Sequence, residues 1–228
     1  MKRSEINAII QTAQAFLAEY RFPLPPFARW TPDDWRTKGP ECREIVDRGL
    51  GWDITDWGTG DFAYHGLVLF TLRNGTMDNL RAGRGKIYSE KVLIVQPRQQ
   101  TPLHFHWSKV EDFANRGGGQ LVMTLYNSTP EGGLADSEVR VSVDGIERRC
   151  APGEPVSLAP GESLSLHTGL YHGFMAEAAP TLVVEVATVN DDAGDNRFFE
   201  PVGRFPTIEE DVPPAHLLVG DYSAYYRA

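Results

Sequence analysis

From about Phe62 onward the chain consists of short apolar runs separated by Gly, Pro and Asn turn signals, and this pattern constrains the fold most strongly. One run is followed by Asp144-Gly145, a strong signal for a two-residue hairpin. Short strands with regular turns and few intervening helices indicate an all-β protein, either a closed barrel or a jelly roll. We expect strands within residues 67–72, 91–95, 121–125, 139–143 and 181–187.

Residues 1–60 follow a helical period instead. Apolar residues between Ile6 and Tyr20 recur at the spacing of one helix face, with Ser4 as the expected N-cap. Thr31 and the Pro and two Asp residues after it predict a second helix start, and a short third helix is expected over 41–48. We therefore expect a helical extension over 1–60, a barrel over 61–200 and a C-terminal extension over 201–228, all in one compact domain.

Acidic residues outnumber basic ones by 31 to 22, which gives a formal net charge of −9. Because no cationic stripe is present, we expect no nucleic-acid partner. No run approaches the roughly 18 apolar residues of a membrane helix, and the N-terminus lacks the apolar core of a secretory signal. Cys42 and Cys150 are too few for a disulfide framework and predict reduced thiols in a cytoplasmic protein.

Two of the six histidines, His104 and His106, are separated by a single residue. Residues i and i+2 of a strand project from the same face, so both imidazoles can point into a barrel. Glu111 follows after a short turn, and His172 lies much later in the chain. Three imidazoles and one carboxylate can hold a divalent metal with positions left open, and they suit Mn²⁺, Fe²⁺ or Co²⁺ better than a soft metal.

The spacing His-x-His-x4-Glu-x6-Gly, which ends at Gly118, resembles the first metal motif of the cupin superfamily. Gly161, Gly169 and His172 resemble the second motif. The sequence departs from the usual glycine, proline and asparagine of these motifs at three positions, Arg98, His167 and Ala176. These departures affect turns rather than ligands.

Longer strings resemble the bacterial D-lyxose isomerases of the cupin superfamily over nearly the whole chain. They comprise residues 1–4, 24–27, 51–55, 70–75, 104–107, 115–119 and 189–192. The resemblance implies a cupin-type β-barrel and Mn²⁺-dependent isomerisation of D-lyxose to D-xylulose, with D-mannose and D-fructose as a weaker pair. It also implies a set of metal ligands, namely His104, His106, Glu111 and His172. A homodimer is the expected assembly, with the aromatic C-terminal segment as a candidate interface.

Two charged residues are candidates for the chemistry. Glu185 interrupts an apolar strand, where a buried charge is costly unless it is paired or used. If the carboxylate faces the cavity, it could carry a proton during the reaction. The alternative is an outward-facing, half-exposed side chain. Lys109 shares a strand face with Glu111 if that strand has already begun, and would polarise a sugar oxygen; a solvated hairpin lysine is the alternative. Our hypothesis is that Glu185 moves the C2 proton to C1 through an enediol while Lys109 assists an oxygen.

Three further residues, Lys91, Asp195 and Arg197, are candidates for sugar contacts. The alternatives are a snorkelling surface lysine for Lys91 and a solvated loop for the other two. His65 and His216 are expected to be structural. His167 is expected to be a turn residue rather than a fifth ligand, with a contact to substrate as the alternative.

Two other function classes remain open from the residues alone. Cupin sites with three histidines and one glutamate also serve non-haem iron dioxygenases, and non-catalytic sugar-binding cupins exist. The lysine next to Glu111 and the charged lining favour a polyol over an aromatic substrate. Oxygen uptake with Fe²⁺, or sugar binding without turnover, would distinguish these classes from an isomerase.

Overall fold

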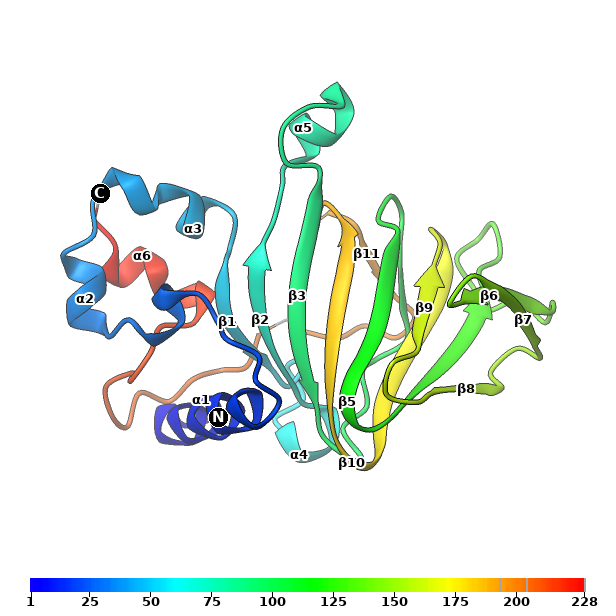
Figure 1. Ribbon diagram of the computed structural model, residues 1–228, viewed down its shortest axis with the longest axis horizontal. Helices are drawn as coiled ribbons and strands as arrows, with labels where there is room; N and C mark the ends of the chain where they lie inside the picture. Colours follow the sequence, from blue (N-terminus) through cyan, green and yellow to red (C-terminus); the bar gives the residue numbers. More distant parts are fainter. Residues whose placement is uncertain (193, 204, 228) are drawn as a thin grey trace.

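Antiparallel strands form the body of the computed structural model, which describes residues 1–192, 194–203 and 205–227. Most of the helices gather on one side, and both chain ends lie on that side (Figure 1). The strands are β1 (Gly51–Thr55), β2 (Leu67–Arg73), β3 (Tyr88–Val95), β4 (His104–His106), β5 (Glu111–Asn127), β6 (Val139–Val143), β7 (Ile146–Cys150), β8 (Pro155–Leu158), β9 (Ser163–Leu166), β10 (Leu170–Thr188) and β11 (Asn196–Phe198). The helices are α1 (Arg3–Glu19), α2 (Pro32–Arg36), α3 (Arg43–Asp47), α4 (Phe62–His65), α5 (Met77–Ala82) and α6 (Tyr222–Tyr225), with 3-10 turns η1 (Pro26–Arg29), η2 (Pro40–Cys42) and η3 (Val219–Asp221).

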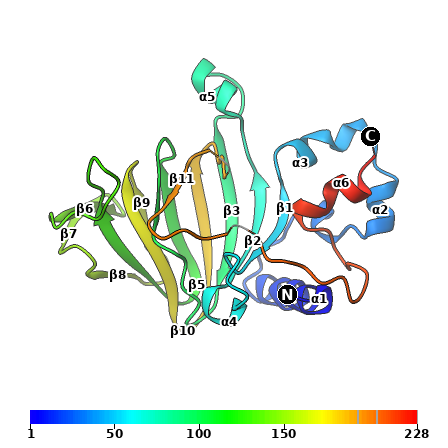
Figure 2. The same cartoon turned by 180° about the vertical axis from the view of Figure 1, so that it is seen from behind.

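The long strands β5 and β10 pair with each other along their length, and each contributes to both layers of the barrel. The C-terminal half of β10 pairs with β3, whereas its N-terminal half pairs with β4, which in turn pairs with β11. On the other side, β9 pairs with the start of β5 and β8 with its middle. The segment with β11 lies behind the β10–β5 pair in Figure 1 and in front of it in Figure 2. The side chains between the two layers form the main apolar core.

The expected all-β, cupin-type barrel with N-terminal helices is confirmed. Each segment predicted as a strand lies within one, and the Asp144-Gly145 turn joins β6 to β7 with positive φ values of 52° and 80°. These angles are those of a two-residue hairpin turn that matches the twist of its strands. The sheet begins earlier than expected, because β1 lies before residue 61 and pairs with β2.

A bulge at Gly117–Gly119 bends β5 where it crosses between the layers. The β5–β10 register shifts between Glu177 and Thr181 and again between Leu182 and Val183. A Cβ on Gly118 would lie 2.0 Å from the Pro180 carbonyl oxygen, so a side chain cannot be accommodated at this close approach. Gly118 and Gly119 therefore permit this close backbone packing, and Gly117 leaves room for the Tyr20 ring.

Helix α1 covers the outer face of β1, β2 and β3. Its buried residues Ile6, Ile10 and Leu17 pack against Trp52 and Phe70 of the sheet. Each fully buried aliphatic side chain contributes about 1.5–3 kcal/mol, so this layer is a substantial part of the fold. The helix starts earlier than expected, and Ser4 lies inside it, where its Oγ donates to Asp211 at 2.6 Å.

The two ends of the chain are joined by a buried ion-pair cluster. The Arg3 guanidinium, 1% exposed, contacts Glu210 at 2.6 Å and Asp221 at 2.9 Å. Beside it, Tyr222 packs against Trp35 with ring centroids 4.6 Å apart. Much of the aromatic C-terminal segment is thus packed on this chain's own helices.

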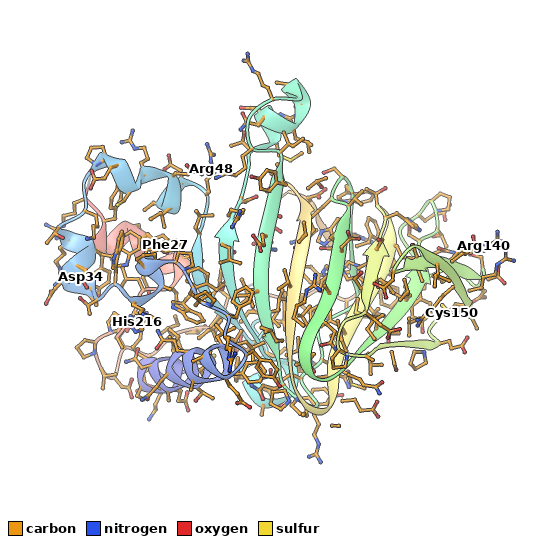
Figure 3. All side chains as sticks on the ribbon, in the orientation of Figure 1. Phe27, Asp34, Arg48, Arg140, Cys150 and His216 are labelled. Atoms are coloured by element: carbon orange, nitrogen blue, oxygen red, sulfur yellow. The ribbon has the colours of Figure 1, made fainter. Side chains whose placement is uncertain are left out.

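The two cysteines lie far apart, and both are buried free thiols. Cys150 lies on the far edge of the sheet in Figure 3, whereas Phe27 and His216 mark the opposite, helical side. Cys42 belongs to η2 on that helical side. Among the described residues, no helix has both the length and the apolar character needed to cross a membrane.

Candidate metal centre

Three histidines meet between the two layers of the barrel. His104 and His106 project from one face of β4, and His172 of β10 lies directly opposite His104 in the strand register. One ring nitrogen from each lies within 4.8 Å of the others. The predicted i, i+2 pair and its distant partner are therefore brought together by the β4–β10 pairing.

The hydrogen bonds of two imidazoles fix their tautomers. His104 Nδ1 lies 2.8 Å from the Pro102 carbonyl oxygen, and His172 Nδ1 lies 3.0 Å from that of Leu170. A carbonyl oxygen only accepts, so each Nδ1 carries the proton and each Nε2 keeps a lone pair for a ligand.

Glu111 opens β5 beside the histidines. Its Oε1 lies 3.2 Å from His106 Nε2 and 3.1 Å from His172 Nε2. Despite these distances, all three atoms are buried without a well-formed hydrogen bond. Unpaired buried polar atoms are costly, and a divalent cation between them would satisfy all three, so the residues fit a metal.

Burial sets the charges of these groups. Burial, with the neighbouring His172 and His106, lowers the pKa of His104 well below its usual value. Burial and Lys109 lower the pKa of His106. Burial alone would raise the pKa of Glu111, but Lys109 and the histidines hold it well below its usual range. His104 and His106 are therefore neutral and Glu111 is ionised, which are the forms that bind metal.

A buried network of charges continues from Glu111. Lys109 Nζ lies 2.6 Å from Glu111 Oε2 and 3.0 Å from Glu185 Oε1, and Lys91 Nζ lies 3.3 Å from that same Glu185 oxygen. Asn190 Oδ1 accepts from Lys91 at 2.6 Å and from Lys109 at 3.5 Å. All four charged residues are at most 6% exposed. Lys91, Lys109 and Glu185 thus face the interior, not solvent.

The two glutamates keep Lys109 charged. Burial would lower the pKa of Lys109, but Glu111 and Glu185 outweigh it and raise that pKa above its usual value. Lys109 is therefore a fixed cation and hydrogen-bond donor.

A cavity of about 50 Å³ lies at this cluster. Its polar lining includes Lys91, Lys109, Glu111 and Glu185, and its apolar walls include Trp57 and Phe198. Phe198 stacks on His104 with ring centroids 5.3 Å apart. The volume suffices for a few water molecules.

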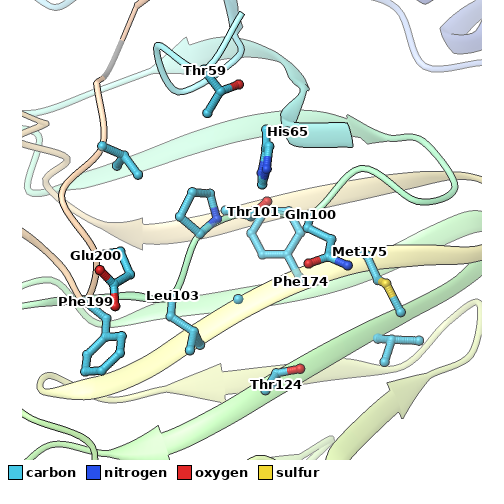
Figure 4. Close-up of a pocket in the computed structure, with 14 residues that line it drawn as sticks. Thr59, His65, Gln100, Thr101, Leu103, Thr124, Phe174, Met175, Phe199 and Glu200 are labelled. Carbon is cyan, nitrogen blue, oxygen red and sulfur yellow. The ribbon is translucent and has the colours of Figure 1, made fainter. Parts of the chain in front are cut away.

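A larger cavity of about 440 Å³ lies on the outer side of β5 and β10 (Figure 4). It shares Thr101 and Phe174 with the inner cavity, and its lining includes His65 and Glu200 but none of the histidines of the cluster. Ligand-forming and titratable side chains converge at the smaller cavity, which is therefore the candidate active site.

The two remaining sugar-contact candidates lie beside the inner cavity, and neither is among the residues that line it. Both carboxylate oxygens of Asp195 accept hydrogen bonds from residues 108–109. Arg197 is exposed, and its strand neighbours Asn196 and Phe198 line the cavity. A sugar contact by Asp195 or Arg197 stays a prediction.

Sequence reasoning did not assign a role to Asn190, although it touches both lysines. Asn190 follows β10, and its backbone exchanges hydrogen bonds with the side chain of Asn74, itself 8% exposed. In the sequence, Asn190 is a polar residue shortly after the predicted strand 181–187. It lies within residues 189–192, which contributed only to the family resemblance.

The fold and the site define a class: β-barrel proteins with an interior histidine–glutamate centre suited to a metal. The D-lyxose isomerase family model matches residues 1–222. The D-lyxose/D-mannose isomerase of Serratia proteamaculans is 46% identical over 97% of this chain and 98% of that protein. The one of Escherichia coli O157:H7 is 43% identical over 99% of this chain and 100% of that protein. The chain belongs to the D-lyxose isomerase family.

Solved structures support the same fold. L-ribose isomerase of Cellulomonas parahominis with L-ribose has a TM-score of 0.59 at 18% identity, over 92% of this chain and 98% of that one. L-ribose isomerase of Acinetobacter sp. DL28 with L-ribose has a TM-score of 0.57 at 15% identity, over 91% and 98%. At these identities the likeness concerns the fold alone.

Proposed function

We propose that this protein is a metal-dependent aldose–ketose isomerase that interconverts D-lyxose and D-xylulose, with D-mannose and D-fructose as a slower pair. The observation that carries the proposal is the buried network of Lys91, Lys109, Glu111 and Glu185 directly beside three histidines. Such a network supplies both a proton carrier and fixed positive charge in one enclosed site. The relatives described as D-lyxose/D-mannose isomerases support the choice of sugars.

His104, His106, His172 and Glu111 are the residues that would hold the metal. Imidazole nitrogens, with the Nε2 lone pairs of His104 and His172 left free, and an ionised carboxylate suit Mn²⁺, which we propose as the cofactor; Co²⁺ and Fe²⁺ suit the same donors. When bound, the ion supplies Lewis-acid polarisation of the substrate carbonyl and offsets the negative charge that develops on the sugar oxygens.

Glu185 is the proposed base. Its Oε1 is held by Lys91 and Lys109, and the residue lines the inner cavity. The carboxylate takes the proton from C2, leaving an enediolate anion and a neutral Glu185; the O2 hydroxyl proton passes to O1, and Glu185 returns the first proton to C1. The C2–H bond is thus exchanged for a C1–H bond, and the aldose becomes a ketose without an added reductant.

The two lysines stabilise charge and are not bases. Lys109 stays protonated beside Glu111 and Glu185, so its ammonium donates to a sugar oxygen as negative charge develops there. Lys91 lines the same cavity and is the proposed contact to a second sugar hydroxyl. The apolar walls around Trp57 and Phe198 exclude water from the enediol.

We propose a homodimer built through the outer face of β4 and β10. An aromatic row crosses this face: Trp107 contacts Phe105 at 4.6 Å, Phe105 contacts Tyr171 at 4.8 Å, and Tyr171 contacts Phe199 at 5.9 Å between ring centroids. Trp107 and Phe199, the two ends of this row, are 62% and 40% exposed and would supply apolar surface to a partner subunit. A single monomeric species in sedimentation at all concentrations would contradict this assembly. The unpaired buried thiols suit a reducing compartment, so we propose a cytoplasmic location.

The deciding experiment is a metal-swap isomerase assay. The purified protein is stripped with chelator, and ketose formation from D-lyxose and D-mannose is followed before and after Mn²⁺ is added. We expect no turnover without metal and faster turnover of D-lyxose with it. Sugar binding without any ketose would indicate a sugar-binding protein, and oxygen uptake with Fe²⁺ would indicate a dioxygenase.

A further inference from the structure

The turn between β4 and β5 joins two groups of the metal centre. Residues 107–110 connect His106, the last residue of β4, to Glu111, the first of β5, and they carry Lys109. Trp107 of this turn contacts Phe105 through its ring, with centroids 4.6 Å apart, and is 62% exposed. The placement of Lys109 and Glu111 therefore depends on what fixes the turn.

Asp195, which is distant in sequence, holds the turn of residues 107–110 in place. Its Oδ1 accepts from the backbone N–H of Ser108 at 2.7 Å and from Ser108 Oγ at 2.8 Å, and its Oδ2 accepts from the backbone N–H of Lys109 at 2.9 Å. The Asp195 carbonyl also accepts from the Trp107 N–H at 3.3 Å. One residue thus binds three consecutive residues of the turn.

The carboxylate itself is well anchored. Asp195 is 5% exposed, its N–H donates to the Asp191 carbonyl at 3.0 Å, and the next residue, Asn196, pairs with His106 in the β4–β11 ladder. Among the ion pairs of the described residues none involves Asp195, so the backbone and hydroxyl donors carry its stabilisation. An amide in its place would offer one acceptor atom instead of two, and its NH₂ would face the Lys109 N–H.

We propose that Asp195 is a positioning residue that places Lys109 for the reaction. Lys109 is held at its amide by Asp195 Oδ2 and at its ammonium by Glu111 and Glu185. With both ends fixed, the ammonium stands between the glutamate of the metal centre and the proposed base. The kinetic part of this inference rests on the proposed isomerase function, whereas the placement of Lys109 and its effect on metal affinity do not.

The test compares D195N with a matched control, D211N. Asp211 also holds a serine through both oxygens, accepting from Ser4 N–H at 2.9 Å and Ser4 Oγ at 2.6 Å, far from the site at the start of α1. Residues that orient metal-site groups affect activity or metal affinity by about 10–100-fold. We expect D195N to lower kcat and weaken Mn²⁺ binding within that range with KM little changed, and D211N to leave all three within about twofold while lowering thermal stability.

A double-mutant cycle on Mn²⁺ affinity tests whether Asp195 acts through Lys109. Calorimetric titration of the apo-proteins gives the affinities of wild type, D195N, K109M and the double variant, and needs no turnover. We expect D195N to weaken binding in the wild-type background but by less than about twofold in the K109M background.

Several outcomes would overturn the inference. Wild-type kcat and Mn²⁺ affinity in D195N would remove Asp195 from the site, and equal losses in both backgrounds would show that it does not act through Lys109. A stability loss alone, like that of D211N, would leave it a structural residue. If wild type forms no ketose but the cycle shows the coupling, the isomerase proposal fails and the positioning role stands.

Discussion

Lys109 Nζ and Glu185 Oε1 lie 3.0 Å apart inside the barrel although the two residues are 76 positions apart in the chain. Strand β10 brings the glutamate, and the turn before β5 brings the lysine. The pair joins the proposed proton carrier to the carboxylate of the metal centre, because the same ammonium also contacts Glu111 at 2.6 Å.

The first prediction concerns Glu185. We expect E185Q to lower kcat by about 10²–10⁴-fold, because an amide keeps the contacts to the lysines but cannot take the C2 proton. Mn²⁺ titration should show that the variant still binds metal. The control is E177Q, an exposed glutamate on the same strand, which should keep normal kcat. A near-normal rate for E185Q would exclude the residue as the base.

The second prediction concerns the metal ligands. We expect H172A to weaken Mn²⁺ binding by about 100-fold or more, because it removes a buried imidazole with a free Nε2. The matched control is H167A, an exposed histidine a few residues earlier whose Nδ1 faces the Thr168 carbonyl. Calorimetric titration of both apo-proteins measures the difference, and equal affinities would argue against His172 as a ligand.

The third prediction concerns pH and the apo-protein. The pKa values of His104 and Glu111 are lower in the folded protein than their ordinary values of 6.5 and 4.5, so the unfolded chain binds more protons. Stability should therefore be fully present above pH 6.5 and fall as the pH drops, first through the histidine and below pH 4.5 also through the glutamate. Urea unfolding at stepped pH measures this loss. In H104N the decline just below pH 6.5 should be shallower, and an unchanged decline would contradict the assignment.

The fourth prediction concerns helix α1. I10A should lower the free energy of unfolding by about 2–5 kcal/mol, because Ile10 is 1% exposed between the helix and the sheet. I146A, at a site 68% exposed, should change it by less than about 0.5 kcal/mol. Urea denaturation gives both values. Ketose formation per folded I10A molecule should stay normal, since the helix packs on the outer face of the barrel.

Much of the fold was predictable because its signals are local. Turn chemistry at Asp144-Gly145 and the helix start at Thr31 depend on a few consecutive residues, and both formed as expected. The helix start at Ser4 was wrong, because the pairing of Lys2 and Arg3 with residue 209 begins the helix earlier. That contact joins the two ends of the chain and leaves no local signal.

The sequence by itself determined the strand class of the fold, the shared face of His104 and His106, and the family, since periodicity and matching strings are written along the chain. Only the tertiary structure decided that His172 stands opposite His104, that Glu185 points inward, and that Asp195 holds the turn that carries Lys109. Period-2 alternation shows which residues share a strand face but not which face becomes the interior or which strands pair. The interior face and the strand pairing are decided when the apolar faces of both layers are buried against each other, and this burial brings distant residues together.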